Sequence, residues 1–191
     1  MFAALLLLAN PAQARDLVWT GIDYGDVHMV GSLDFNDPDE IFPDYLIKWN
    51  GLFIGEMMPL LEKRLGVHAK ASTSHLGPIH RATDPDSHIV RDDSISPDES
   101  YLSPADVAKR VTTYDLTAKE GLGLTFIADQ LNKPTESGCY WVTFYDIASR
   151  DVLSTSRRCA PARGFGFRNY WFRTVKTLVS DLRKKDLPRQ K

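Results

Sequence analysis

The chain has 191 residues, of which 43% are hydrophobic and 25% are charged. Its length and apolar content fit one globular domain with a substantial core and leave little room for a second domain. Beyond the first residues, no run approaches the 18 apolar side chains of a membrane-spanning helix, so we expect no such helix in the rest of the chain.

Charge is distributed unevenly along the chain. Residues 150–191 contain twelve Lys or Arg and three Asp, a net charge of +9, which leaves −11 for residues 1–149 because the total is −2. The two parts could pack together and neutralise each other. Alternatively, the basic part could bind an anionic partner, for which we expect envelope lipid or polysaccharide before nucleic acid.

Residues 1–14 have the features of a signal peptide. An apolar run precedes Ala12-Gln13-Ala14, the small-x-small pattern that signal peptidase cleaves, although no basic residue separates Met1 from the run. A buried N-terminal helix is the alternative. We therefore expect a mature chain of residues 15–191, periplasmic or secreted, with no transmembrane span.

The two cysteines, Cys139 and Cys159, lie at the ends of a predicted β-hairpin whose turn is centred on Ser149. This register places them opposite one another, so a cross-strand disulfide is geometrically feasible. A disulfide would agree with export to an oxidising compartment. Two buried free thiols are the alternative.

The first half of the chain alternates strand and helix patterns. Residues 16–31 favour a first strand with a kink or a short hairpin at Gly21 and Gly25. Residues 41–65 favour a long helix that kinks or restarts at Pro59 and ends at Gly66. A short strand is expected at 67–72. Residues 73–105 are predicted to be irregular, with a short extended stretch at 88–90.

The second half supplies most of the predicted sheet. Ser103 and Pro104 begin a second helix, residues 124–129 form a buried strand, and the hairpin 139–159 adds two more. A third helix spans 167–182, and residues 183–191 look like a frayed basic tail. The order β-α-β-(irregular)-α-β-β-β-α predicts an α/β (α+β) fold with a mixed sheet of about five strands and three main helices.

Local signatures of common hydrolases and nucleotide-binding proteins are absent from the sequence. An active site built from distant residues stays open. The acid pairs Asp23 with Asp26 and Glu56 with Glu62 could serve hydrolysis only if they share a cleft. Glu56 stands among apolar residues of the long helix, so its carboxylate must face water or find a partner such as one of the C-terminal arginines.

The richest set of possible metal ligands lies in the irregular segment. His75, His80 and His88 are weak candidates, because their spacing does not match known zinc signatures. Four aspartates, at positions 84, 86, 92 and 93, accompany them. A solvated polar loop is the simpler interpretation, and we expect no metal and no cofactor.

The stretch RGFGFRNYW, residues 163–171, leads into the last helix. Gly164 and Gly166, the helix start, and the side chains of Arg168 and Asn169 are compatible with anion binding. A dinucleotide site is rejected, because Asn169 stands where that fingerprint needs a third glycine. The alternative is a structural joint, in which Phe165 or Phe167 packs with Tyr170 and Trp171 against the sheet.

Three segments, WNGLFIGE (49–56), GLGLTFI (121–127) and GFGFRNYW (164–171), resemble a group of uncharacterised exported bacterial proteins of similar length. The resemblance implies the compartment and a single domain and carries no functional residue. We therefore expect a non-enzymatic exported module that binds an anionic envelope component or another envelope protein through its basic C-terminal surface. The alternative is an exported hydrolase that uses carboxylates or a loop-bound divalent metal.

Overall fold

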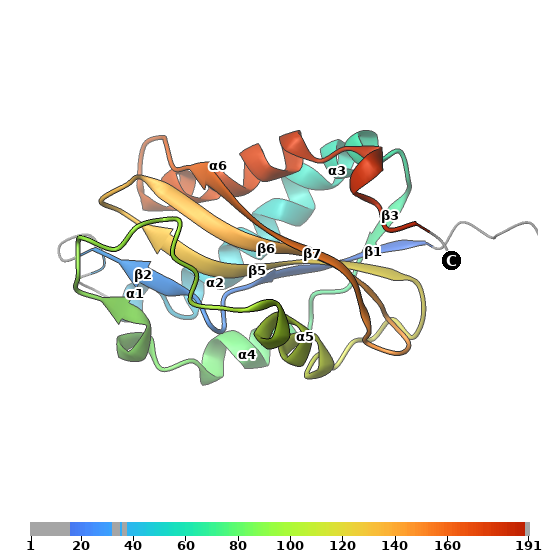
Figure 1. The fold of residues 1–191 in the computed structure, drawn as a ribbon, viewed down its shortest axis with the longest axis horizontal. Helices are drawn as coiled ribbons and strands as arrows, with labels where there is room; N and C mark the ends of the chain where they lie inside the picture. The colour runs from blue at the N-terminus through green and yellow to red at the C-terminus, as the bar shows by residue number, and fades with distance from the viewer. Residues whose placement is uncertain (1–15, 32–34, 36–37, 190–191) are drawn as a thin grey trace, which may run out of the picture.

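The computed structural model describes residues 16–31, 35 and 38–189, so the predicted signal peptide lies outside it. The fold is α/β, as predicted, with helices packed on a mixed sheet of seven strands (Figure 1). The strands are β1 Leu17–Asp23, β2 His28–Val30, β3 Ala69–Ala71, β4 Ile89–Val90, β5 Leu122–Asn132, β6 Ser137–Asp146 and β7 Val152–Pro161. The helices are α1 Pro38–Ile41, α2 Asp44–Leu52, α3 Met58–Leu65, α4 Leu76–Ala82, α5 Pro104–Thr112 and α6 Phe167–Asp181, with short turns η1 Phe53–Met57, η2 Pro85–His88 and η3 Lys184–Asp186.

Strands β1 and β2 are successive parts of one interrupted strand. Both run parallel to β5: β1 pairs with residues 122–127 and β2 with residues 130–132. On the outer side, β3 pairs with β1 and β4 pairs with β2, also in parallel. The sheet edge is therefore broken where the chain turns through residues 24–27, which leaves a gap between β3 and β4. This break is the interruption that the sequence predicted near Gly21 and Gly25.

The other side of the sheet is the predicted antiparallel hairpin. β5 pairs with β6, and β6 pairs with β7 in a register that places Cys139 opposite Cys159. The two cysteines form a disulfide, which confirms the prediction. Two of the seven strands exceed the five that were expected. One is β2, which continues the first strand beyond its break, and the other is the two-residue β4.

The long first helix is divided more finely than its apolar periodicity indicated. Helix α2 begins only after Pro43, which lies between α1 and α2, and a π-helical turn at residues 53–57 separates α2 from α3. Pro59 occupies the first turn of α3, where its missing N–H removes no hydrogen bond. Gly66 ends the helix with φ 68°, as predicted.

Apolar side chains fill both faces of the sheet because β5 and β6 alternate. One face carries Leu124, Phe126 and the hairpin residue Val142, which pack with α2, α3 and α6. The opposite face carries Ile127 and Trp141, which pack with α5. Figure 1 shows α4 and α5 on the side of the sheet away from α3 and α6.

Two sequence predictions need correction. The segment 73–105 contains α4, which the sequence analysis missed because Gly77 and Pro78 weaken its helical pattern. The C-terminal segment is ordered as far as Leu187: residues 184–186 form η3, and Asp186 Oδ1 lies 3.0 Å from Arg158 Nη2. The last two residues of the predicted tail lie outside the described part of the chain.

Candidate functional site

The loop between β7 and α6 is the first candidate site. The N–H of Ala162 donates to the carbonyl of Glu136, which fixes the start of the loop on the β5–β6 turn. Gly164 and Gly166 follow with φ 127° and 75°, conformations that other residues rarely adopt. Between them, Phe165 is 98% exposed. The glycines thus present an aromatic side chain to solvent. The connection from β7 to α6 lies at one end of the molecule (Figure 1).

The start of α6 is a packed joint beside this exposed loop. Phe167 and Trp171 lie among the aromatic rings of the main core, and Trp49 Nε1 donates to the carbonyl of Arg168 over 2.9 Å. Of the two phenylalanines considered for packing, Phe167 takes that role and Phe165 does not. The side chains of Arg168 and Asn169 point outward and are exposed, as the anion-binding hypothesis requires.

Glu56 finds a partner in α6, which is a lysine and not one of the arginines expected. Lys176 Nζ donates to Glu56 Oε2 over 2.7 Å, with both side chains partly exposed. This ion pair joins the acidic and basic parts of the chain, as does the buried pair of Asp129 with Arg157. Within the described residues, however, Arg163, Arg168 and Arg173 are exposed and make no ion pair. The positive charges near residues 163–169 are therefore not all neutralised by carboxylates of the described chain.

Two of the histidines considered as metal ligands instead fill the gap in the sheet edge. His80 Nε2 accepts the N–H of Tyr24, and His88 Nδ1 contacts the carbonyl of Val27 at 2.6 Å. Asn50 completes the series, because its side chain accepts from the N–H of Ile22 and donates to the same residue's carbonyl. Side chains thus satisfy the backbone where no strand pairs with it.

Asp23, at the end of β1, is the centre of a buried charge cluster. Its fully buried carboxylate accepts from Arg110 Nε at 2.7 Å, Arg110 Nη2 at 3.0 Å, the hydroxyl of Tyr114 at 2.8 Å and the N–H of Gly25. Burial by itself would raise the pKa of Asp23, but the hydrogen bonds and charge of Arg110 outweigh it and lower that pKa. A Cβ at Gly25 would collide with the guanidinium, so glycine is required there. Asp26, the other half of the predicted acid pair, also faces Arg110.

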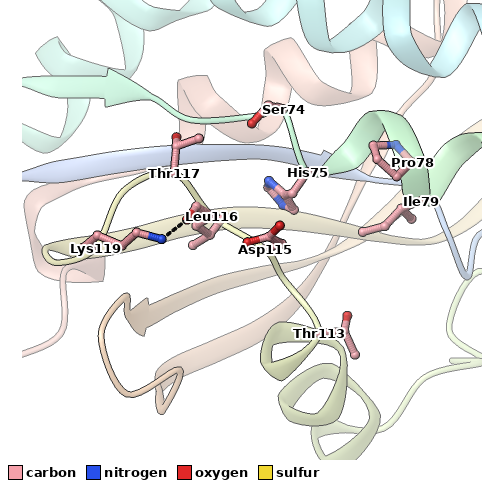
Figure 2. Close-up of a pocket in the computed structure, with 9 residues that line it drawn as sticks. All are labelled: Ser74, His75, Pro78, Ile79, Thr113, Asp115, Leu116, Thr117 and Lys119. Carbon is pink, nitrogen blue, oxygen red and sulfur yellow. Dashed lines mark hydrogen bonds between the residues drawn. The ribbon is translucent and has the colours of Figure 1, made fainter.

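His75 lies beside this cluster and lines a cavity of about 420 Å³ (Figure 2). The residue is 6% exposed, and its ring is 4.6 Å from that of Tyr114. Neither ring nitrogen has a hydrogen-bond partner among the described residues. Burial lowers the pKa of His75 to about 4, so the ring is neutral at pH 7.

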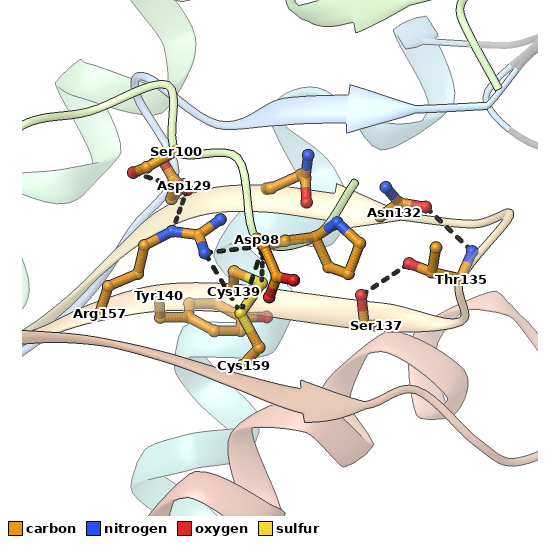
Figure 3. The surroundings of a disulfide bond; sticks show 12 residues. Asp98, Ser100, Asp129, Asn132, Thr135, Ser137, Cys139, Tyr140, Arg157 and Cys159 are labelled. Atoms are coloured by element: carbon orange, nitrogen blue, oxygen red, sulfur yellow. Dashed lines mark hydrogen bonds and ion pairs between the residues drawn. A yellow bond between two sulfur atoms is a disulfide. The ribbon is translucent and has the colours of Figure 1, made fainter. Parts of the chain in front are cut away.

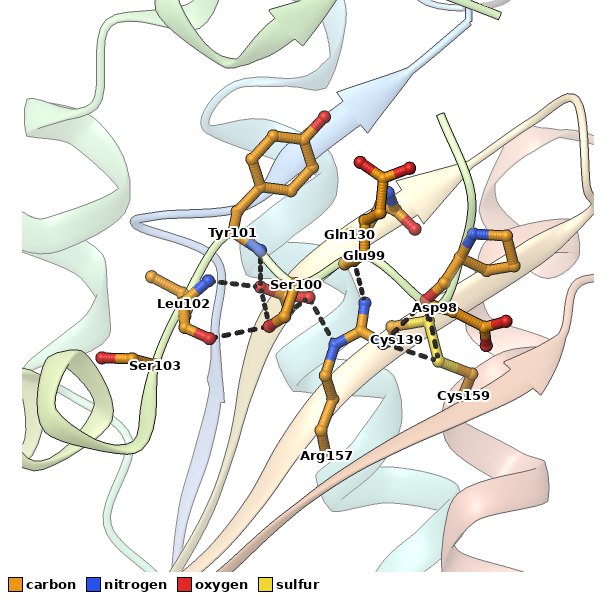
Figure 4. A network of polar contacts seen from close by, with 12 residues as sticks. Asp98, Glu99, Ser100, Tyr101, Leu102, Ser103, Gln130, Cys139, Arg157 and Cys159 are labelled. Carbon is orange, nitrogen blue, oxygen red and sulfur yellow. Dashed lines mark hydrogen bonds and ion pairs between the residues drawn. A yellow bond between two sulfur atoms is a disulfide. The ribbon is translucent and has the colours of Figure 1, made fainter. Parts of the chain in front are cut away.

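A second buried network surrounds the disulfide (Figures 3 and 4). The carboxylate of Asp129 accepts from Arg157 Nε at 2.7 Å and from the N–H groups of Tyr101 and Leu102. Arg157 also donates to the carbonyls of Pro97 and Glu99. These bonds hold residues 97–102 across the hairpin face. Asp129 and Arg157 therefore have a structural role. In the sequence, the one sign of that role is the position of Asp129 in an otherwise apolar strand.

The predicted sites are therefore brought together only in part. Glu62 accepts from the N–H of Ala69 and lies apart from Glu56, which pairs with Lys176, so this acid pair does not share a site. No group of three metal-ligating side chains occurs among the described residues, and none of their helices is long and apolar enough to cross a bilayer. No protein-family model and no curated protein sequence matches the chain.

Proposed function

We propose that the protein is an exported binding module that associates with an acidic lipid surface through the Phe165 loop, defined as residues 163–169. The observation that carries the proposal is the 98% exposure of Phe165 on a loop whose two arginines, Arg163 and Arg168, are exposed and unpaired within the described chain. An aromatic ring inserts among acyl chains while neighbouring guanidinium groups bind lipid phosphates.

The disulfide supports the predicted compartment, because such bonds persist in oxidising environments. The carboxylates proposed for a hydrolase already have partners: Arg110 and Tyr114 bind Asp23, and Lys176 binds Glu56. No observation therefore favours the hydrolase alternative over binding.

The expected affinity follows from the groups in the loop. Burying one phenylalanine contributes about 2 kcal/mol, and each arginine near an acidic surface contributes about 1 kcal/mol. The sum of about 4 kcal/mol corresponds to a partition constant of roughly 10³ M⁻¹. Such binding is weak and reversible, so detecting it requires millimolar lipid.

Vesicle co-sedimentation tests the proposal. We expect binding to vesicles that contain phosphatidylglycerol, little binding to pure phosphatidylcholine, and a marked loss when NaCl rises from 0.1 to 0.5 M. Phe165→Ser should weaken binding by about thirtyfold, and Arg168→Gln by about fivefold. Leu153→Ser is the matched control, because it removes a 45% exposed apolar side chain from the start of β7, outside the Phe165 loop.

Equal binding to the two vesicle types, or equal effects of the Phe165 and Leu153 substitutions, would overturn the proposal. Salt-sensitive binding to an acidic polysaccharide with no binding to lipid would also reject the lipid surface and assign the basic loop to a different partner.

A further inference from the structure

The inference concerns the outer side of β7, the last strand on the hairpin side of the sheet. β7 is ten residues long and pairs only with β6. Within the described residues, no backbone group outside β6 bonds to the backbone of residues 153–160. The outer side of β7 is therefore a free sheet edge. Proteins usually protect such an edge, because an unpaired strand can pair with another chain.

The two cysteines show which backbone groups face this edge. Opposite residues of an antiparallel pair lie about 4.5 Å apart at Cα when they share no hydrogen bonds and about 5.5 Å apart when they do. The Cα atoms of Cys139 and Cys159 are 4.0 Å apart, so the N–H and carbonyl of Cys159 point away from β6. The register is regular over residues 154–161, so the backbone groups of Arg157 and Thr155 point the same way. Each of these three residues presents one donor and one acceptor at the edge.

The usual means of protecting an edge are missing from the middle of β7. Its two arginines are held by other parts of the chain, because Arg157 is bonded to Asp129 and Arg158 to Asp186. The one register shift of the hairpin falls near Leu153, at the start of the strand, and proline occurs only at its last residue. Residues 154–160 are therefore extended, regular and open to pairing.

A second copy of the chain fits this edge better than a flexible peptide does. Its β7 is already extended, so pairing orders little further chain, and one contact satisfies both free edges. The two strands then run antiparallel about a twofold axis. A register centred on Arg157 would oppose like charges. A register centred on Ser156 places Thr155 against Arg157 of the second copy and opposes no like charges.

The same register brings opposite charges together at both ends of the contact. Counted from Ser156, Asp151 lies opposite Pro161 of the second copy and diagonal to its Arg163. Asp151 and Arg163 are both exposed and make no ion pair among the described residues. We propose that the protein forms a weak homodimer by antiparallel pairing of its β7 strands, with an Asp151–Arg163 ion pair at each end. Arg163 also belongs to the Phe165 loop, so the dimer is tested without lipid.

Sedimentation equilibrium of the disulfide-bonded chain tests the proposal. A single pair of strands is at the small end of specific interfaces, so the measurements extend from about 10 µM to about 1 mM protein. We expect a monomer–dimer equilibrium in this range. The amides of Thr155, Arg157 and Cys159 should exchange with deuterium more slowly as the concentration rises. Those of Ser154 and Ser156, which point towards β6, should not change.

Charge exchange identifies the contact. Asp151→Arg should weaken dimerisation by about tenfold, because it replaces both attractive pairs by repulsive ones. Adding Arg163→Asp should restore the dimer, whereas a defect in folding would not be reversed. Asp39→Arg is the matched control, since it makes the same change at an exposed aspartate of α1, which packs with α2 and η2.

Thr155→Pro removes an N–H that faces the edge and makes no bond to β6, so it should abolish the dimer. If circular dichroism shows that this variant does not fold, the charge-exchange series decides. The proposal is overturned if the chain is monomeric up to about 1 mM, which would leave the edge to a strand of another protein. It is also overturned if Asp151→Arg weakens dimerisation no more than Asp39→Arg, or if the double exchange does not restore it.

Discussion

Replacing Arg110 with methionine tests whether the Asp23 cluster holds α5 against the end of β1. Arg110 lies on α5 and Asp23 at the end of β1, so their two hydrogen bonds join a helix to the broken strand. Methionine keeps most of the side-chain length and removes the charge. The carboxylate of Asp23 then retains only the hydroxyl of Tyr114 and the N–H of Gly25 as donors.

The expected loss is large because a buried charge is left without its counter-ion. Asp23 is fully buried and Arg110 is 19% exposed, so solvent cannot substitute for the guanidinium. Breaking a buried pair by removing one partner typically costs about 3 to 5 kcal/mol. For a chain of this size that corresponds to a fall of about 6 to 20 °C in melting temperature.

The pH dependence of the loss identifies its cause. In the parent protein the pKa of Asp23 is lowered, so its stabilising contribution is present above the unfolded pKa and is lost as pH falls through the folded pKa. Without Arg110, burial dominates and raises the pKa of Asp23 above its unfolded value. The variant should then recover stability relative to the parent as pH falls from 7 towards 4, by at most about 1.4 kcal/mol per pH unit.

Urea unfolding at pH 7 and pH 5 measures both effects. Lys109→Met is the control, since it removes a neighbouring positive charge from the exposed side of the same helix. A free energy of unfolding within 1 kcal/mol of the control at pH 7 would refute the assigned role of Arg110. A difference between the two variants that does not change with pH would show that Asp23 is not the group responsible.

Three further outcomes follow from other contacts. Burial lowers the folded-state pKa of both His75 and His80 to about 4. The free energy of unfolding should therefore fall as pH drops from about 6.5 to 4, by up to about 1.4 kcal/mol per pH unit for each histidine. Ring titrations with midpoints near 6.5 would contradict this. Asn50→Leu should destabilise the protein by about 2 to 4 kcal/mol, because it leaves the N–H and carbonyl of Ile22 buried without partners; a loss below 1 kcal/mol in urea would show that the gap is satisfied otherwise. Reducing the disulfide, which spans 20 residues, should lower the free energy of unfolding by about 3 kcal/mol; an unchanged melting temperature after verified reduction would contradict that figure.

Local patterns in the sequence were sufficient for most elements of the fold. The hairpin register followed from a turn centred on Ser149, and Ser103 with Pro104 marked the start of α5, where a capping box with Asp106 is found. Both features involve residues close in sequence, for which few other hydrogen-bonding partners or strand registers are possible. The break before α2 was missed, because the apolar periodicity hid the effect of Pro43.

The contacts of the candidate sites could not be predicted in the same way. Asp23 and Arg110 are separated by 87 residues, and Asp129 and Arg157 by 28. Helical spacing places Arg110 near the apolar face of Val107 and Tyr114, unlike Lys109, but it does not identify the carboxylate that Arg110 meets. Such pairs depend on how the strands and helices are brought together, and one sequence carries no direct signal of that arrangement.

The broken sheet edge explains why His75 differs from its neighbours. Parallel strands must satisfy their outer N–H and carbonyl groups, and where β3 and β4 leave a gap the chain uses Asn50, His80 and His88 for that purpose. The fold thereby accounts for the positions of the buried Asn50 and His80 and of the half-buried His88. His75 is buried as well, but it bonds to no backbone or side-chain group among the described residues, and it faces a cavity. Its two ring nitrogens have almost no accessible surface, so the ring acts through its packing against Tyr114 and has no part in the sheet edge.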